Sequence, residues 1–135
     1  MADFNTDLIE EFRVNDGKTS GPFAGAPLML FTHTGAKSGK QRTNPIVYTR
    51  DGDNLVIIAS KGGAPTNPDW YYNLVANPEV TVELPGGETF KARAREVHGD
   101  ERDRLFAAQA ELMPGFKEYE AKTTRVIPVF VLERV

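Results

Sequence analysis

The chain opens with a pattern typical of a short amphipathic helix. The apolar residues that recur at helical spacing are Phe4, Leu8, Ile9 and Phe12, and acidic residues occupy positions between them. We therefore expect a helix over residues 4–13 that packs its apolar side on the rest of the domain. Covering a pocket is the alternative use of this helix, whereas its acidic polar face disfavours attachment to anionic lipid.

After a connection over residues 17–27 that is rich in Gly and Pro, the pattern changes to short apolar runs. These runs predict strands at 28–32, 45–49, 54–59 and 127–132, and alternation of apolar and polar residues predicts strands at 79–84 and 88–97. The turn residues at 51–53 and 85–87 join two pairs of these strands as hairpins. Six strands joined mostly by hairpins predict a mainly β fold with inserted helices, a small antiparallel barrel, and not a βαβ sheet.

Two further helical regions are predicted between the strands. The first runs over residues 68–76, with Asn67 as its N-cap and Pro68 in its first turn. The second begins near residue 99 and is interrupted by Pro114, after which a short helical piece covers residues 116–122. Its apolar positions are Leu105, Phe106, Ala110 and Leu112. All these elements fit one domain of 135 residues.

Composition sets broad limits on function. Hydrophobic residues make up 40% of the chain and no apolar run approaches the length that crosses a bilayer, so we expect a globular, water-soluble protein without a stable membrane anchor. The acidic start is unlike a secretory signal, which makes the cytoplasm the expected location. The chain has no cysteine, and His33 and His98 are far apart in sequence. We therefore expect no metal site and interpret both histidines as ordinary strand or strand-end residues.

The distribution of charge is uneven. The net charge of −3 argues against nucleic-acid binding, which needs a basic surface. Residues 20–50 nevertheless contain no Asp or Glu, and the cations within them are Lys37, Lys40, Arg42 and Arg50. A solvated loop with chance charges explains this basic stretch, and binding of an anionic ligand is the alternative.

Two glycine-containing segments carry groups that bind anions. Residues 35–42 read Gly-Ala-Lys-Ser-Gly-Lys-Gln-Arg, in which small residues let the backbone approach a ligand beside two or three cations. Residues 59–64 combine glycines with Lys61 at the end of a strand, shortly before the helix at 68–76. The first segment lacks the glycine spacing of a P-loop. Two such segments in one small domain favour an anionic ligand over plain turns.

The helix at 68–76 offers a surface for a flat ring. Trp70, Asn73 and Leu74 share one of its faces, and an aromatic ring, an amide and an aliphatic side chain suit a planar heterocycle. Packing of Trp70 in the core is the alternative. The sequence shows no close carboxylate pair, Ser-His-Asp arrangement or metal set for hydrolysis. Hydride transfer needs none of these, because a bound redox cofactor carries it.

Four motifs follow one another along nearly the whole chain. They are T-G-A-K-S-G-K-Q-R-T-N-P (34–45), A-S-K-G-G-A-P (59–65), N-P-D-W-Y-Y-N-L-V-A-N-P (67–78) and T-R-V-I-P-V-F-V-L-E (124–133). Together they resemble the deazaflavin-dependent nitroreductase family of actinobacteria. The resemblance implies a split β-barrel, similar to flavin-mononucleotide-binding barrels, that uses coenzyme F-420 for hydride transfer. This coenzyme is a deazaflavin with an anionic phospholactyl-oligoglutamate tail, which fits the basic stretch.

The resemblance also implies which residues bind the cofactor. Those implied for the phosphate and the tail are Ala36, Lys37, Ser38, Arg42, Thr43 and Asn44. Those implied to line the deazaflavin ring are Pro45, Ile46, Val47, Ile58, Ala59, Ser60 and Lys61. Those implied to close the site from the helix are Asp69, Trp70, Tyr71, Tyr72 and Asn73.

On the substrate side of the ring, family members place several tyrosines. The corresponding positions here are Val47, Met113, Phe116 and Tyr119, so only one hydroxyl is kept. These apolar replacements favour an enone, a quinone or a coumarin-like lactone over a bulky nitro compound as the small-molecule acceptor. Ser60 and Tyr119 are the candidate catalytic residues, which would polarise the acceptor or relay a proton.

Other functions are open at this point. A flavin-mononucleotide oxidoreductase on the same barrel would have less use for so many cations along the loop. A carrier or sensor of reduced deazaflavin would bind the cofactor without turnover. An RNA-binding barrel is disfavoured by the acidic balance. The sequence leaves monomer and homodimer as alternatives.

Overall fold

The computed structural model describes residues 4–17, 27–60, 63 and 66–135. The helices of this part of the chain are α1 (Phe4–Val14), α2 (Asp69–Ala76), α3 (Gly99–Leu112) and α4 (Gly115–Ala121). Its strands are β1 (Leu28–Thr34), β2 (Gln41–Val47), β3 (Thr49–Asp51), β4 (Asn54–Ile58), β5 (Glu79–Glu83), β6 (Thr89–Val97) and β7 (Val129–Arg134). None of the helices in this part of the chain combines the length and the apolar character that a membrane span needs.

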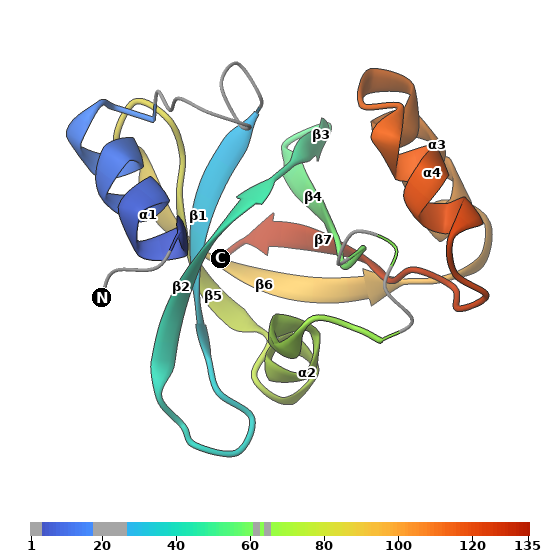
Figure 1. Cartoon of the computed structure of the whole chain (residues 1–135). Helices are drawn as coiled ribbons and strands as arrows, with labels where there is room; N and C mark the ends of the chain where they lie inside the picture. Colours follow the sequence, from blue (N-terminus) through green and yellow to red (C-terminus); the bar gives the residue numbers. More distant parts are fainter. Residues whose placement is uncertain (1–3, 18–26, 61–62, 64–65) are drawn as a thin grey trace.

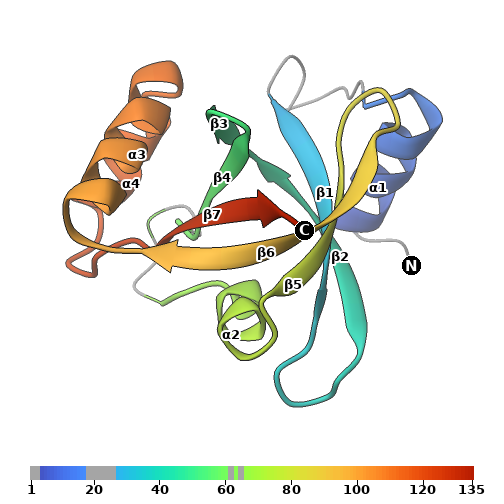
Figure 2. The same ribbon diagram turned by 180° about the vertical axis from the view of Figure 1, so that it is seen from behind.

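The strands form one antiparallel sheet in the order β2-β1-β5-β6-β7-β4-β3. The sheet is strongly curled, with α1 beside β1 and β2 at one end and α3 and α4 beyond β3 and β4 at the other (Figure 1). Seen from behind, α2 lies below β5, β6 and β7 (Figure 2). The predicted split-barrel class is therefore confirmed, with seven strands in the described residues where the sequence predicted six.

The extra strand arises because one predicted strand is divided. The sequence predicted a continuous strand over 45–49, but Tyr48 separates β2 from β3. The Tyr48 backbone N–H donates to the carbonyl of Pro27 at 2.9 Å. This bond takes Tyr48 out of the ladder, so that β2 and β3, consecutive in sequence, end at opposite edges of the sheet.

The basic loop, which joins β1 to β2 over residues 35–40, is shorter than the predicted strands at 28–32 and 45–49 implied. Gln41, Arg42 and Thr43 belong to β2, where Arg42 is the register partner of His33 on β1. The loop closes before them because Gly35 N–H donates to the carbonyl of Lys40 at 2.8 Å. Arg42 is consequently held on a strand beside the loop that carries Lys37.

The start of α2 corrects another prediction. Its N-cap is Pro68, without a side-chain capping bond, so the prediction of Asn67 as N-cap is wrong. The Asn67 side chain is engaged elsewhere, since its Oδ1 accepts a hydrogen bond from Arg125 Nη1 at 2.8 Å. A cap bond would need the same oxygen.

Both faces of the sheet are covered by apolar side chains. Along β4, Leu55 and Ile57 belong to a cluster with Phe130 and Leu74, while the alternate residues belong to a second cluster under α3 and α4. A third cluster joins α1 to β1, as predicted for the N-terminal helix. On α3 the predicted apolar positions are buried with one exception, Leu112, which is 72% exposed. Because successive side chains of a strand point to opposite faces of the sheet, one strand contributes to a core on each face.

Candidate functional site

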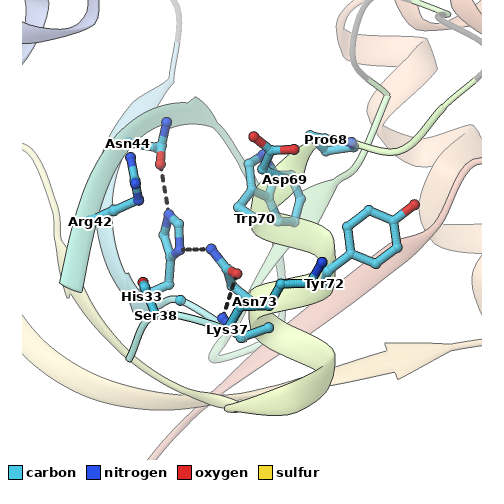
Figure 3. Close-up of a pocket in the computed structure, with 12 residues that line it drawn as sticks. His33, Lys37, Ser38, Arg42, Asn44, Pro68, Asp69, Trp70, Tyr72 and Asn73 are labelled. Carbon is cyan, nitrogen blue, oxygen red and sulfur yellow. Dashed lines mark hydrogen bonds between the residues drawn. The ribbon is translucent and has the colours of Figure 1, made fainter. Parts of the chain in front are cut away.

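A pocket of about 920 Å³ lies between the β1–β2 loop, the adjoining ends of β1 and β2, and the first turns of α2 (Figure 3). Its volume is in the range of small-molecule and cofactor sites. The residues that line it are His33, Gly35, Ala36, Lys37, Ser38, Arg42, Asn44, Pro68, Asp69, Trp70, Tyr72 and Asn73. The basic loop and the aromatic helix singled out in the sequence therefore meet at one place.

The cations of this pocket are not neutralised by the protein itself. Within the described residues, the Lys37 and Arg42 side chains form no ion pair. Five arginines elsewhere are paired with carboxylates, for example Arg13 with Glu83 at 2.8 Å. Asp69 brings one carboxylate to the pocket from α2. Two exposed, unpaired cations are the groups that form charge-assisted hydrogen bonds with an anionic ligand.

A chain of hydrogen bonds joins the elements around the pocket. The Ala36 backbone N–H donates to Asn73 Oδ1 at 2.9 Å, and Asn73 Nδ2 lies 3.1 Å from His33 Nδ1. The other ring nitrogen of His33, Nε2, lies 2.7 Å from Asn44 Oδ1. The loop, β1, β2 and α2 are thus connected through one imidazole and two amides (Figure 3).

His33 is a buried pocket residue to which sequence reasoning gave no role in the site. It was interpreted as an ordinary strand residue, but it lines the pocket while only 2% exposed. Burial lowers the pKa of His33, the hydrogen bond to Asn44 opposes this shift, and the charge of Arg42 adds to it. The available signal was its position at the end of a predicted strand, two residues before Gly35 of the basic loop.

Trp70 serves both roles that the sequence left open. Its ring packs edge-on against Phe31 at 5.3 Å and tilts against Phe130 at 6.0 Å, so part of it belongs to the core. It also lines the pocket with Tyr72, which is 52% exposed. Leu74, which shares the predicted face, is buried. The helix thus presents an aromatic wall that the core holds in place.

The residues predicted for the cofactor fall into two groups in space. Those that line the pocket are Ala36, Lys37, Ser38, Arg42, Asn44, Asp69, Trp70, Tyr72 and Asn73, and His33, Gly35 and Pro68 join them without having been predicted. Those outside the lining are Thr43, Pro45, Ile46, Val47, Ile58, Ala59, Ser60 and Tyr71. Lys61 lies outside the described residues.

Two of the residues outside the lining have other partners. The Thr43 hydroxyl lies 2.8 Å from that of Thr32, across the β1–β2 pair. The Tyr71 hydroxyl donates to Glu96 at 3.2 Å, and its ring packs on Phe130 at 5.7 Å. Burial, followed by the charge of Glu96, raises the pKa of Tyr71. Tyr71 therefore ties α2 to the sheet.

The four predicted substrate residues all contact or belong to the second core cluster, and Val47 also contacts the third. Val47, Met113 and Tyr119 are partly buried against it, and Phe116 belongs to it. The rings of Phe116 and Tyr119 meet edge-on at 5.2 Å. These residues come from β2, the end of α3 and α4, so only the tertiary fold makes them neighbours.

Ser60 and Tyr119 lie on adjacent segments. The carbonyl of Ser60 accepts a hydrogen bond from Gly63 N–H at 3.0 Å. A Cβ added to Gly63 would lie 2.8 Å from the Tyr119 carbonyl oxygen, which shows how closely Gly63 packs on α4. The backbone of Gly63 therefore contacts the backbones of both predicted catalytic residues.

Arg125 anchors the segment that carries Ser60. Its guanidinium donates to the carbonyls of Ala59 at 3.2 Å and Ser60 at 2.7 Å, in addition to Asn67. It thus ties together the two ends of the β4–α2 connection. Burial lowers the pKa of this guanidinium, and the charge of Tyr72 opposes the shift. The sequence assigned no role to Arg125, although it lies in the motif at 124–133.

The chain is similar in sequence to proteins of one family. A family model described as F420H(2)-dependent quinone reductase matches residues 7–134. An F420H(2)-dependent quinone reductase of Mycobacterium tuberculosis is 40% identical over 127 residues, which cover 91% of this chain and 85% of that protein.

Two solved structures are similar in both fold and sequence. A structure of an F420-H2-dependent reductase, FDR-A, is 44% identical with a TM-score of 0.73, covering 79% of this chain and 94% of that one. A second, described as a domain-swapped dimer, is 40% identical with a TM-score of 0.74, covering 95% and 98% of the two chains. The fold likeness agrees with the curled antiparallel sheet described above.

Proposed function

The chain belongs to the F420H(2)-dependent quinone reductase family, and on that premise we propose that the pocket beside α2 binds the phosphate and acidic tail of coenzyme F-420. The family membership confirms the resemblance that the four motifs indicated. It also confirms the class of enzyme, an F-420-dependent oxidoreductase, and its cofactor.

One observation carries the proposed location. Lys37 and Arg42 line the pocket without an ion pair among the described residues, beside the Ser38 hydroxyl and the Asn44 amide. Phosphate and carboxylate oxygens take charge-assisted hydrogen bonds from such groups. The donor set therefore fits the anionic part of F-420, whereas flavin mononucleotide has a phosphate but no acidic tail and would use fewer of these groups.

The flat part of the cofactor would contact the wall formed by Trp70 and extend towards the Ala59–Ser60 segment. When bound in its reduced form, F-420 supplies the hydride. The protein binds and orients the cofactor and excludes water from the reacting atoms. Arg125 holds the Ser60 segment for this purpose through its two carbonyl contacts.

For the acceptor we propose a quinone. The Mycobacterium tuberculosis relative is named as a quinone reductase, and the four predicted substrate residues form a largely apolar group that suits a planar, uncharged ring. The Tyr119 hydroxyl and the Ser60 hydroxyl are the groups proposed to hold or donate the proton that the reduced oxygen requires.

The cofactor assignment is tested by titrating the protein with F-420 and, separately, with flavin mononucleotide. Trp70 is the single tryptophan, so its fluorescence reports on the pocket wall. We expect binding of F-420 and much weaker binding of flavin mononucleotide. Preference for the flavin, or binding of neither, would overturn the proposal.

The acceptor is tested by following oxidation of reduced F-420 with a quinone, an enone and a nitroaromatic compound of similar size. We expect the quinone to be reduced fastest. Tight cofactor binding without turnover of any acceptor would instead indicate a carrier or sensor of the reduced cofactor.

The assembly is proposed to include a homodimer. One similar solved structure is described as a domain-swapped dimer, and the chain covers 98% of it. Light scattering of the purified protein should therefore give a dimer mass at high concentration. A monomer mass at every concentration would contradict this proposal.

A further inference from the structure

We infer that His33 is a positioning residue of the pocket: as a neutral imidazole it orients the Asn73 amide, which in turn holds the backbone of Ala36. The consequence for ligand binding rests on the proposed function, whereas the hydrogen-bond arrangement stands on the structure alone. Ala36 directly precedes Lys37 and Ser38, whose polar side chains also line the pocket. Holding Ala36 therefore places both of them for an anion.

The positions of the protons follow from one backbone group. The Ala36 N–H can only donate, so the amide oxygen of Asn73, at 2.9 Å, must accept from it. The other branch of the same amide, Nδ2, then faces His33 Nδ1 at 3.1 Å and must donate to it. His33 Nδ1 consequently carries no proton.

The remaining ring nitrogen completes the arrangement. A neutral imidazole without a proton at Nδ1 carries it at Nε2. His33 Nε2 lies 2.7 Å from Asn44 Oδ1, which accepts that proton in a hydrogen bond. The ring also stacks on Phe31 with centroids 4.9 Å apart. One tautomer therefore satisfies every partner, and the side chain has no freedom to rotate without losing a bond.

A protonated His33 would break this chain. Its Nδ1–H would face the Nδ2–H of Asn73, and turning the Asn73 amide over would place Nδ2 against the Ala36 N–H instead. The charged groups around the ring are Arg42 from β2, Lys37 from the loop and Asp69 from α2. Burial of the ring and the charge of Arg42 oppose protonation, in agreement with the lowered pKa of His33.

The contact through Asn73 is a main link between the loop and α2. A second bond nearby, from Nδ2 of Asn77, the C-cap of α2, to the carbonyl of Thr34 at the end of β1, is long at 3.4 Å. The loop is otherwise held by its own bonds, such as that from Gly39 N–H to the carbonyl of Gly35. Loss of the Asn73 contact should therefore let the loop move, and a ligand would have to order it again on binding.

The tautomer is tested by nuclear magnetic resonance of the ring nitrogens. The chain has two histidines, and His98 is exposed, so it is an internal control. We expect His33 to carry its proton at Nε2 and to remain mostly neutral at pH 6.5, the ordinary pKa of an imidazole. A proton at Nδ1, or a His33 that is mostly charged at pH 6.5, would overturn the inference.

Asn73→Asp tests the direction of the contact. The carboxylate still accepts from Ala36 N–H, but its second oxygen now faces His33 Nδ1 and favours a proton there. We expect His33 to titrate at a clearly higher pH than in the unchanged protein, with His98 unaffected. An unchanged His33 titration would show that residue 73 does not control its Nδ1 and would contradict the inference.

His33→Phe tests the consequence for the loop. Phe keeps an aromatic ring beside Phe31 but offers no hydrogen bond, and His98→Phe is the matched control. We expect faster amide hydrogen exchange at Ala36 in His33→Phe and not in the control. F-420 should bind about tenfold more weakly, as estimated from the ordering of loop side chains.

The outcomes separate the two proposals. If the unchanged protein does not bind F-420, the proposed function fails, while ring-nitrogen spectra and Ala36 exchange still decide the role of His33. If the protein binds F-420 and His33→Phe keeps both its affinity and its Ala36 protection, the positioning role is wrong and the proposed function stands.

Discussion

Lys37 and Arg42 illustrate what a charged residue reveals once its neighbours are known. Both are exposed, as are many cations on a protein surface, and several other exposed cations here are matched by carboxylates, such as Arg104 by Asp51 at 3.2 Å, whereas these two share one pocket. An exposed ion pair contributes little to stability. A pair of unmatched cations beside one pocket raises the local positive potential instead, which is useful only for a ligand.

The first prediction concerns these cations. Replacing Lys37 or Arg42 by Ala should weaken F-420 binding about 10- to 100-fold, because a hydrogen bond to a charged group contributes about 1.5–3 kcal/mol. Lys40→Ala is the matched control, since Lys40 lies on the same loop but does not line the pocket. Titrations followed by Trp70 fluorescence should also show weaker binding at high salt. Equal effects of all three substitutions would contradict the location of the anion site.

The second prediction concerns pH. The pKa of His33 is lowered below its ordinary 6.5 in the folded protein, so the unfolded chain takes up this proton at a higher pH than the folded protein does. The contribution of His33 to stability is therefore complete above the ordinary pKa of 6.5 that it has in the unfolded chain, and it declines as the pH falls below this value. Denaturant unfolding at about pH 8 and about pH 5.5 should show a smaller decline in His33→Phe than in His98→Phe. An equal decline would contradict the assignment.

Element boundaries shift where a side chain has a distant partner. Asn67 has the side chain of an N-cap, but Arg125, which is 58 positions away, uses its oxygen, and α2 begins without a side-chain cap. The β2 strand begins before its apolar residues because its polar first half pairs with β1. Local propensity located these elements correctly and misplaced their ends.

The third prediction concerns the turn between β4 and α2. Gly63 has a φ of +83°, and a Cβ there would meet the Tyr119 backbone at 2.8 Å. Gly63→Ala should destabilise the protein by clearly more than the roughly 1 kcal/mol expected from left-handed backbone strain alone. Gly39→Ala is the matched control, because Gly39 has a φ of +70° with nothing within 4 Å. Thermal unfolding measures both, and equal losses would show that α4 does not pack on this turn.

The whole molecule is organised by one sheet that serves both cores. Neighbouring residues of β4, such as Val56 and Ile57, belong to different apolar clusters, so neither cluster exists without the strand. α1 adds Leu8 and Phe12 to a third cluster that shares β1 with the first. We propose on this basis that the chain is a single domain, as its length suggests.

The fourth prediction follows from the shared sheet. Unfolding by denaturant should be one cooperative transition, with the same midpoint by Trp70 fluorescence, which reports on the first cluster, and by far-ultraviolet circular dichroism, which reports on the whole backbone. Substitution of Phe106 by Ala in the second cluster should reduce the free energy of unfolding by about 3–5 kcal/mol and lower both midpoints together. Separate midpoints would show that the clusters unfold independently.

The sequence by itself determined the features that depend on neighbouring residues. The apolar spacing in α1, the turn residues of the β5–β6 hairpin and the alternation in β5 and β6 predicted the correct elements, because backbone geometry imposes their periods. The basic stretch, the aromatic helix and the four ordered motifs also indicated an anionic cofactor and the correct family.

Only the tertiary structure decided how these parts form a site. It showed that the basic loop and α2 share a pocket, that His33 joins them, and that Arg125 anchors the Ser60 segment. Asn73 is separated from Ala36 by 37 positions and from His33 by 40, and Arg125 from Ser60 by 65. Hydrogen bonds over such separations leave no periodic trace in a sequence, because they depend on where the curled sheet brings distant segments together.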